Sequence, residues 1–350
     1  MNCWGKRMKL CWGICSAGNI SNNFVSALSS LPSEDHEVVA IAARSKEKAN
    51  KFAEKHQIAV AYEGYEALAR DTNVDIVYIG SINQTHLPLC QLFLNHSKNV
   101  LCEKPLGLNK REVQEIIDLA KEKDVFFMEG LWTRFFPAIA KLQELLAANH
   151  IGQIKMVSGT FGIPMVQERV QLKEYGGGGL LDIGVYLYQM TLLVFGTPPL
   201  SSSTKGFLTD SGVDETTVTT MLFPNKAMAS LTCSISQFLD NDMEIRGTQG
   251  CIKIKNPFWC PTQLEVTTKG TTNVLDFPLP KTKATFLFEN IVGFQYEAEA
   301  VRQCLIKGLK ECPVVSHDES LLVAELLQNA RHDVGYLLEA DKQKGPMTCQ

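Results

Sequence analysis

The stretch Leu10-Cys-Trp-Gly-Ile-Cys-Ser-Ala-Gly-Asn-Ile-Ser21 decides the fold. It begins as an apolar run typical of a buried strand and passes through a glycine turn into a helical segment that reaches Leu28. Strand, tight turn and helix N-terminus form a phosphate site, because free N–H groups and the helix dipole face the anion. In the G-x-G-x-x-G frame the positions are Ser16, Gly18 and Ser21, so only the middle glycine remains, where the backbone must approach a pyrophosphate. We expect a dinucleotide site here; the alternative is an ordinary strand-to-helix turn.

Strands and helices continue to alternate from this stretch to about residue 130. Apolar runs of strand length recur between segments with helical periodicity, and this alternation predicts a doubly wound parallel sheet, the Rossmann arrangement in an α/β fold. We expect a first domain of residues 1–131, with further strands at 38–43, 75–80, 100–103 and 125–128 and helices at 46–56, 87–95 and 109–123.

The second half of the chain, residues 132–350, has a different rhythm. Short strands dominate from Leu200 to Phe277, and in the segment 229–236 apolar residues alternate with Ser and Thr, as in a two-faced strand of an antiparallel sheet. We expect an α+β domain with an open, mostly antiparallel sheet and helices on one face, at 138–148, 180–195, 294–307 and 318–338. The Ser/Thr face is either solvated or packed on a second subunit.

The end of the second predicted strand indicates which dinucleotide binds. An NAD-binding fold usually carries Asp or Glu there, to hold the ribose 2′-hydroxyl. This chain has Ala43, Arg44 and Ser45 instead, and an arginine without a carboxylate suits a 2′-phosphate. We therefore expect NADP(H) rather than NAD; Ser45 can at the same time be the N-cap of the next helix.

Composition narrows the class of protein. With 350 residues, 45% of them hydrophobic and 21% charged, the chain is expected to be globular, with two domains. A net charge of -4 leaves no basic excess for binding nucleic acid. We expect no membrane segment, since no apolar run reaches about 18 residues. We also expect no secretory signal, since the charged residues 1–9 are not followed by an apolar region of about 7–15 residues. The 11 cysteines include no C-x-x-C pair, so we expect reduced, cytoplasmic thiols and no metal site.

The stretch Val100-Leu-Cys-Glu-Lys-Pro105 brings Lys104 to the carboxyl end of a predicted strand, where ligands bind in open α/β sheets. An enzyme that transfers hydride from an alcohol to nicotinamide needs a base for the hydroxyl proton. Tyr186 is the candidate, and because a phenol has a pKa of about 10, a cation such as Lys104 must favour the phenolate. Asp182, one helical turn earlier, can orient a substrate hydroxyl or bind Lys104. A surface lysine and a core tyrosine are the alternatives, and the sequence leaves open whether Pro105 is cis.

Aromatic residues around the predicted domain boundary are candidates for a substrate pocket. Trp132, Arg134 and Phe161 can form the wall of a site for an aromatic or sugar ring, and domain-interface core is the alternative. For Phe135 and Phe136 the core interpretation is favoured.

Several motifs make the chain similar to the glucose–fructose oxidoreductase/inositol dehydrogenase family. They are, in order, the glycine turn, the Ser81–His86 loop, Glu103-Lys104-Pro105 and Asp182-x-Gly-x-Tyr186. The resemblance covers nearly the whole chain from Met8. Most of the family has His at the last motif position as the acid/base, whereas Tyr186 resembles one branch of the family, which also has the runs 43–44, 132–137 and 259–262.

That branch implies NADP+-linked oxidation of trans-dihydrodiols of aromatic hydrocarbons to catechols, and of D-xylose and related aldoses to lactones. It implies a homodimer formed through the open sheet of the second domain. It also implies that Tyr78, His86, Lys104, Asp182 and Val185 line the coenzyme and alcohol sites. One departure concerns a Gln-His-x-x-His loop of that branch, where Asn83 takes the first His position here.

The predicted site residues follow from these motifs. The catalytic set is Tyr186, Lys104 and Asp182, and the substrate set is Trp132, Arg134, Phe161, Asp182 and Val185. The coenzyme set is Gly13, Ser16, Gly18, Asn19, Ile20, Arg44, Ser45, Tyr78, Ser81, His86, Glu103 and Lys104. Two other functions stay open: an NADPH-dependent carbonyl or sugar reductase, and a non-catalytic regulator that senses NADP(H), against which the catalytic set argues.

Overall fold

The computed structural model describes residues 9–282 and 284–342. They divide into two compact units. The first contains the described residues up to Leu106 together with Glu115–Phe135 and Leu279–His317, and the second contains Gly107–Gln114, Phe136–Pro278 and the described residues from Asp318 onward. The predicted division at residues 131 and 132 treats each domain as one continuous segment, whereas both observed units are discontinuous.

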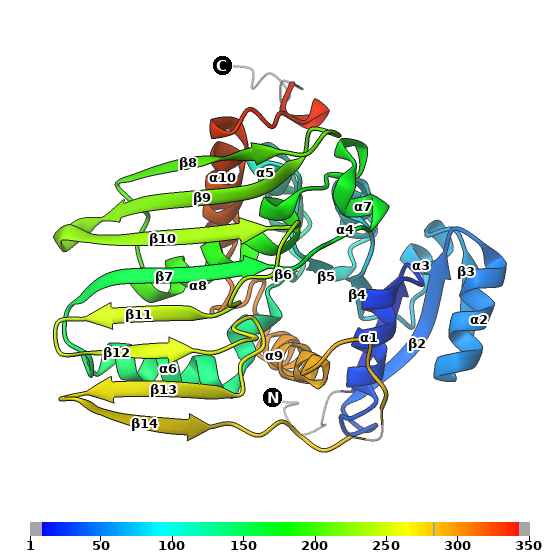
Figure 1. The fold of residues 1–350 in the computed structure, drawn as a ribbon. Coiled ribbons are helices and arrows are strands. Elements are labelled where there is room, and N and C mark those ends of the chain that lie inside the picture. The colour runs from blue at the N-terminus through cyan, green and yellow to red at the C-terminus, as the bar shows by residue number, and fades with distance from the viewer. Residues whose placement is uncertain (1–8, 283, 343–350) are drawn as a thin grey trace. The chain divides into compact units, whose positions relative to one another are not determined.

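The first unit contains a six-stranded sheet in the order β3-β2-β1-β4-β5-β6, in which every neighbouring pair is parallel (Figure 1). Its strands are β1 (Leu10–Cys15), β2 (His36–Ala43), β3 (Val60–Glu63), β4 (Ile76–Ile79), β5 (Asn99–Glu103) and β6 (Phe127–Gly130). The connecting helices are α1 (Asn19–Leu28), α2 (Lys46–His56), α3 (Glu66–Arg70), α4 (His86–Asn95) and α5 (Lys110–Glu122). The predicted doubly wound sheet is confirmed. The short edge strand β3 was not predicted, because its four residues show no buried apolar run.

Helix α9 (Phe294–Ile306) belongs to the first unit, although the sequence assigned it to the second domain. Its first residue, Phe294, packs edge-on against Phe24 of α1, with ring centroids 5.9 Å apart. Farther along, the buried Arg302 donates to Asp35, just before β2, at 2.6 Å. A ring contact and a buried ion pair thus hold α9 against α1 and the segment before β2, and a helical pattern alone does not reveal such distant partners.

His36, the first residue of β2, links this sheet to α9 and should make the stability of the first unit depend on pH. Its Nδ1 accepts from the indole of Trp12 at 3.2 Å, so the neutral ring donates through Nε2 to Glu299 at 2.9 Å. Burial lowers the pKa of His36 below its ordinary 6.5, although Glu299 opposes this. The contribution of neutral His36 to the stability of the first unit is therefore complete above pH 6.5. It is lost as the pH falls through the lower pKa that His36 has in the folded protein.

We expect the free energy of unfolding, measured by denaturant titration between pH 7.5 and 5, to fall in this window for the wild-type protein. His36→Gln keeps an acceptor for Trp12 and a donor for Glu299 but cannot bind a proton, so its slope should be smaller. Equal slopes in the two proteins would contradict this role of His36.

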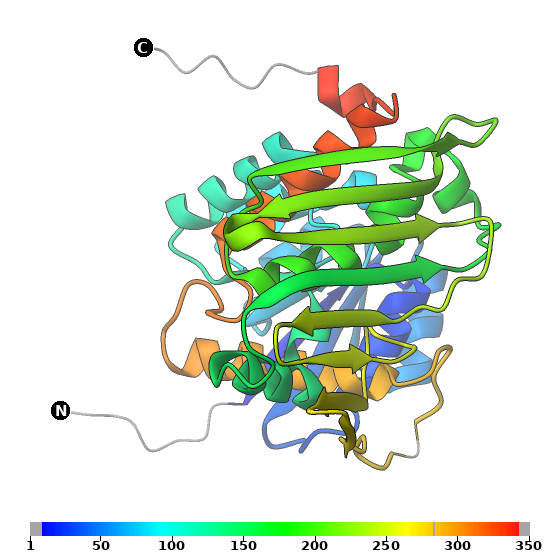
Figure 2. The same ribbon diagram turned by 60° about the vertical axis from the view of Figure 1, so that its left-hand side comes forward.

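The second unit contains an eight-stranded sheet in the order β14-β13-β12-β11-β7-β10-β9-β8 (Figures 1 and 2). Only β7 and β10 pair in parallel, which confirms the predicted mostly antiparallel sheet. Its strands are β7 (Ile154–Gly162), β8 (Ser201–Leu208), β9 (Asp214–Phe223), β10 (Ala227–Ser234), β11 (Met243–Gly247), β12 (Gly250–Ile254), β13 (Gln263–Thr268) and β14 (Thr271–Asp276). Its helices include α6 (Pro137–Ala147), α7 (Glu168–Gln171), α8 (Val185–Phe195) and α10 (His317–Asp333).

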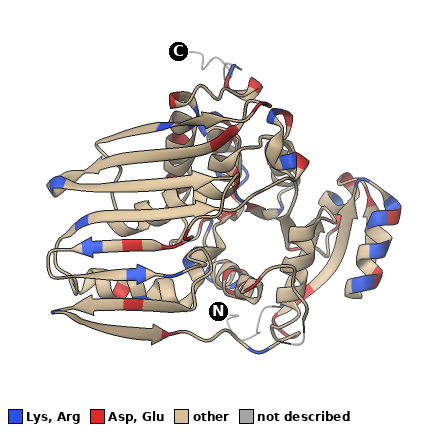
Figure 3. Ribbon diagram, viewed as in Figure 1, with Lys and Arg blue, Asp and Glu red and all other residues tan. Residues whose placement is uncertain are grey.

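The two faces of this sheet differ as the alternating pattern predicted. Ala229, Leu231 and Cys233 of β10 are buried, and α8 packs against β7 and β10. On the other face, Val218 and Leu222 of β9 are 45% and 49% exposed. Lys, Arg, Asp and Glu are frequent on α2 but sparse along β9 and β10 (Figure 3). The outward face of these strands is therefore mainly hydroxyl-bearing and apolar.

Within the described residues, one helical stretch, Lys173–Phe195, has the length and apolar composition to cross a membrane. Of its most apolar window, 89% is buried inside the protein. A core helix meets the same criteria, so this stretch is weak evidence for a membrane segment.

Candidate active site

The turn after β1 has the shape that a dinucleotide phosphate needs. Ser16, at the first glycine position of the motif, has a φ of 86°, in the left-handed region that favours glycine. Its N–H donates to the carbonyl of Ala42 at 2.9 Å, which attaches the turn to β2. Helix α1 then begins after Gly18, and no side-chain cap bonds to its first turn. The N–H groups at Asn19 and Ile20 can therefore face an anion.

Close packing of α1 on β4 depends on Gly80, which the sequence motif did not single out. A Cβ at Gly80 would lie 2.4 Å from Oγ of Ser21, and that hydroxyl donates to the carbonyl of Gly80 at 3.4 Å. The third glycine of the motif normally allows this approach. Here the helix carries a serine and the strand end carries the glycine. Gly13, predicted for the coenzyme site, lies within β1, where a Cβ would fall 2.8 Å from Cγ1 of Val74.

The end of β2 carries the residues from which NADP(H) rather than NAD is expected. Ala43 is buried, and the next residue, Arg44, is exposed. Ser45 is the N-cap of α2, since its hydroxyl accepts from the N–H of Lys48 at 3.4 Å. The guanidinium of Arg44 is thus available at the carboxyl end of the strand.

At the ends of β4 and β5, Tyr78 and Glu103 form a buried pair. The hydroxyl of Tyr78 donates to Oε1 of Glu103 at 2.7 Å, and its ring stacks on Phe24 with centroids 3.8 Å apart. Burial raises the pKa of Glu103 to about 7, although Tyr78 and the charge of Lys104 oppose it. Both residues are predicted to bind coenzyme; in the structure their side chains are buried and hydrogen-bonded to each other.

His86 connects two loops at this edge of the sheet. It is fully buried, with Nδ1 2.8 Å from the carbonyl of Pro105 and Nε2 3.2 Å from that of Ser81. Burial lowers the pKa of His86, so the ring is neutral and its single N–H serves one of these carbonyls at a time. The Lys104–Pro105 peptide bond is cis, and Lys104 lies half-buried at the carboxyl end of β5, as predicted.

In the second unit, a glycine run begins the helical segment that carries Asp182 and Tyr186. Asp214 of β9 accepts from the N–H of Leu180 at 2.6 Å. A Cβ at Gly178, whose φ is 102°, would lie 2.1 Å from the other oxygen of that carboxylate. Burial raises the pKa of Asp214 to about 7, against the pull of its backbone hydrogen bonds. The glycine is therefore required by a buried carboxylate that no sequence motif had indicated.

Asp182 has an arginine partner that sequence reasoning missed. Arg169 of α7 binds it through two contacts, Nη1 to Oδ1 at 2.6 Å and Nη2 to Oδ2 at 3.5 Å. Asp182 lies in a π-helical turn, Leu180–Gly184, which continues directly into α8 with Tyr186. Burial lowers the pKa of the Arg169 guanidinium, but the charges of Asp182 and Tyr186 raise it above its usual value. The second unit thus brings a carboxylate, a guanidinium and a phenol together.

An aromatic cluster lies beside the predicted base. Tyr186 is 8% exposed, and its ring lies 5.9 Å from that of Phe161. Phe161 stacks on Trp259 with centroids 4.0 Å apart and an interplanar angle of 10°. Val185, predicted for the substrate site, is fully buried. Trp259 was noted in the sequence for its resemblance only, and its stacking identifies it as part of this aromatic cluster.

The other predicted pocket residues lie in core positions of their units. Trp132 is 4% exposed and stacks on Phe294 with centroids 4.5 Å apart, and Arg134 is 3% exposed. Phe136 is fully buried, as the core interpretation predicted, and Phe135 is half-buried.

The predicted residues therefore gather in two groups, one in each unit. In the first unit, the glycine turn, Arg44, Ser81, His86 and Lys104 lie at the carboxyl ends of parallel strands, where this class of sheet binds ligands. In the second unit, Tyr186, Asp182 and Phe161 lie together. Within the described ranges, no three His, Cys, Asp or Glu side chains are grouped to hold a metal ion.

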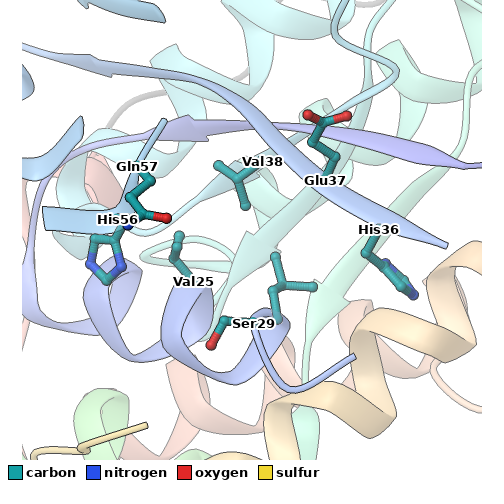
Figure 4. A pocket seen from close by; sticks show the side chains of 8 residues that line it. Val25, Ser29, His36, Glu37, Val38, His56 and Gln57 are labelled. Atoms are coloured by element: carbon teal, nitrogen blue, oxygen red, sulfur yellow. The ribbon is translucent and has the colours of Figure 1, made fainter. Parts of the chain in front are cut away.

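The first unit also has a hollow of about 220 Å³ at the opposite edge of its sheet (Figure 4). It is lined by residues of α1, the start of β2 and the end of α2, including Val25, His36 and Gln57. The amino end of β2 lies here, so this hollow is separate from the predicted coenzyme residues at the carboxyl ends of the strands. It is small for a ligand pocket.

Comparisons with known proteins match two parts of the chain to family models and most of its length to curated relatives. Residues 10–131 match the model of an oxidoreductase family with an NAD-binding Rossmann fold, and residues 139–253 match the GFO/IDH/MocA C-terminal domain. The trans-1,2-dihydrobenzene-1,2-diol dehydrogenase of Danio rerio is 46% identical over 96% of this chain and 100% of that protein. The protein of the same name from Xenopus tropicalis is 45% identical over 93% of this chain and 98% of that protein.

Among solved structures, a 3-ketoreductase from Actinomadura kijaniata in complex with NADP and TDP-benzene has a TM-score of 0.80. It is 24% identical and the match covers 93% of this chain and 98% of that one. At this identity the likeness shows a shared fold.

Proposed function

Because the chain belongs to the GFO/IDH/MocA family of oxidoreductases with an NAD-binding Rossmann fold, as its motifs predicted, we propose that it is an NADP+-dependent dehydrogenase. Its proposed substrates are trans-dihydrodiols of aromatic hydrocarbons, oxidised to catechols, and D-xylose and related aldoses, oxidised to lactones. The observation that carries the diol activity is the 46% identity to a dihydrodiol dehydrogenase over the full length of that relative.

The residues of the first unit fit a nicotinamide dinucleotide. The uncapped start of α1 suits a pyrophosphate, and Arg44, with no carboxylate at the end of β2, suits a 2′-phosphate. Hydride acceptance is the chemistry that bound NADP+ supplies. Lys104 is held at the end of β5 by the buried Glu103 on one side and the His86–Pro105 contact on the other.

The residues of the second unit fit the other half of the reaction. Tyr186 accepts the substrate hydroxyl proton as hydride leaves the carbon, and Lys104 supplies positive charge that favours the phenolate. Asp182 orients the substrate hydroxyl. Phe161 and Trp259 provide flat apolar surface beside Tyr186, which suits an aromatic ring or the C–H face of a sugar.

The outward face of the second sheet is the proposed surface for a homodimer. Val218, Leu222 and Met228 are 45%, 49% and 37% exposed there, on strands with few charged residues. Such a face is typical of subunit interfaces. The nine cysteines within the described residues are free thiols, which supports the proposal that the enzyme works in the reduced cytoplasm.

The test mixes the purified protein with NADP+ or NAD+ and either a trans-dihydrodiol or D-xylose. Formation of NADPH or NADH is followed by absorbance at 340 nm. We expect NADPH to form readily and NADH much more slowly. Arg44→Ser should raise KM for NADP+ by about 10- to 100-fold, the cost of losing charge-assisted hydrogen bonds, and leave KM for NAD+ unchanged. Arg70→Ser, at another exposed arginine of the first unit, is the matched control and should change neither constant.

The opposing outcomes are equally specific. An unchanged KM for NADP+ in Arg44→Ser would remove the argument for the 2′-phosphate. Faster carbonyl reduction with NADPH than diol oxidation would favour a reductase. Tight NADPH binding with no turnover in either direction would favour a sensor.

A further inference from the structure

We propose that Arg169 is a positioning residue whose charge keeps Tyr186 able to accept a proton, with Asp182 holding the guanidinium in place. This inference rests on the proposed function, in which Tyr186 is the base. It assigns a second source of positive charge besides Lys104, and one that the second unit supplies from its own residues.

The geometry fixes Arg169 relative to the helix that carries the base. Its two contacts with Asp182, at 2.6 and 3.5 Å, form a forked pair, which restricts both position and orientation of the guanidinium. The Asp182 side chain is 7% exposed, whereas that of Arg169 is 46% exposed. The carboxylate is thus the fixed partner, and the arginine reaches it from the surface.

Asp182 and Tyr186 are four residues apart on one continuous helical segment, so a cation bound to the first lies near the second. Burial lowers the pKa of Arg169, but the charges of Asp182 and Tyr186 raise it by more, so the net effect is a higher pKa of the guanidinium. Coupling between two ionisable groups is mutual. A phenolate that favours the charged arginine is therefore itself favoured by it.

Two other ionisable groups packed near this segment, Cys233 and Asp214, supply no positive charge. Asp182 opposes the phenolate and needs a counter-charge. Cys233 of β10 is neutral, because burial raises the pKa of its thiol well above the ordinary value. Asp214 of β9 is engaged at the N–H of Leu180. Arg169 therefore has two effects: it attracts the phenolate, and it neutralises the carboxylate that would repel it.

In the step that this serves, the substrate C–H bond breaks and its electron pair leaves as hydride to NADP+. The O–H bond breaks, its proton goes to the Tyr186 oxygen, and the C=O bond forms. The proton then leaves Tyr186 for solvent, so one alcohol and one NADP+ give one carbonyl compound, one NADPH and one proton. Arg169 is unchanged.

The first test is the pH profile of kcat/KM for diol oxidation. The acidic limb reports the ionisation of the base, so Arg169→Met should shift that limb upward by about one to two pH units. Activity below the limb then falls about 10- to 100-fold and recovers at high pH. Arg169→Lys should keep most of the wild-type profile. Arg169→Met combined with Asp182→Asn should recover part of the shift, because the unpaired carboxylate is gone.

The proposal would be overturned if Arg169→Met lost activity equally at every pH. It would also be overturned if the acidic limb of the pH profile shifted as far in Arg169→Lys as in Arg169→Met. NADPH binding, followed by its fluorescence, should be the same in all these variants. A loss of binding would assign Arg169 to another role.

The second test does not depend on turnover. Tyrosinate absorbance near 295 nm is titrated in the wild-type protein and in Tyr186→Phe, and the difference isolates one of the 8 tyrosines. The same difference is measured in the Arg169→Met background, where the ionisation of Tyr186 should move to higher pH. An unmoved titration overturns the role of Arg169 even if Tyr186 proves to be the base. If the ionisation of Tyr186 moves in the Arg169→Met background but Tyr186→Phe keeps full activity, the proposed mechanism is overturned. The coupling between Arg169 and Tyr186 then still holds.

Discussion

Tyr186→Phe should lower kcat/KM for diol oxidation by about 100- to 10,000-fold, the range that proton transfer by a positioned side chain contributes. The change removes one hydroxyl from a ring that is 8% exposed and leaves its packing on Phe161 in place. NADPH should bind as tightly as to the wild-type protein, because the residues proposed to bind the dinucleotide are in the first unit. Steady-state kinetics and NADPH fluorescence check the two parts of the expectation.

Tyr188→Phe is the matched control, two residues along the same helix. Tyr188 is buried, and its hydroxyl is 2.7 Å from that of Thr219. Losing this bond should cost about 1 kcal/mol of stability and leave turnover unchanged. Turnover retained in Tyr186→Phe, or lost equally in Tyr188→Phe, would remove the assignment of Tyr186 as the base.

Gly178→Ala should lower the free energy of unfolding by about 3 kcal/mol or more, which combines left-handed backbone strain with a steric clash. The new methyl group would lie 2.1 Å from a carboxylate oxygen of Asp214, and that carboxylate is fixed by the N–H of Leu180. The backbone at Gly178, with φ of 102°, also disfavours any side chain. Thermal or denaturant unfolding measures the loss.

Gly196→Ala separates the two causes. Gly196 ends α8 with a φ of 63°, and no atom lies within 4 Å of where its Cβ would be. It should therefore cost only about 1 kcal/mol, the strain of a left-handed alanine. Equal losses in the two variants would mean that the contact with Asp214 contributes nothing.

Local sequence patterns predicted many of the strands and helices, because these elements form between residues that are close in the sequence. The apolar run and glycine turn at residues 10–21 predicted β1 and α1, and the alternation in β10 predicted a sheet with one buried face. The spacing of Asp182 and Tyr186 predicted that they share a helical segment, which they do.

The features that the sequence did not reveal depend on partners far along the chain. Arg169 precedes Asp182 by 13 residues across a glycine loop, and Asp214 follows Leu180 by 34 residues, on a strand of the sheet. Neither distance corresponds to a helical or strand repeat. Gly80 has its role only because Ser21 approaches it in space. These contacts are products of the tertiary fold, so no period in the sequence encodes them.

The return of α9 to the first sheet has a consequence for synthesis on the ribosome. Residues 10–130 are translated well before α9, so Phe24 and Asp35 meet Phe294 and Arg302 only after β14 has been made. The strands of the second sheet are translated in between. Until then Phe24 lacks its edge-on contact and Asp35 its counter-charge, and an incompletely folded unit that exposes apolar surface is prone to aggregate.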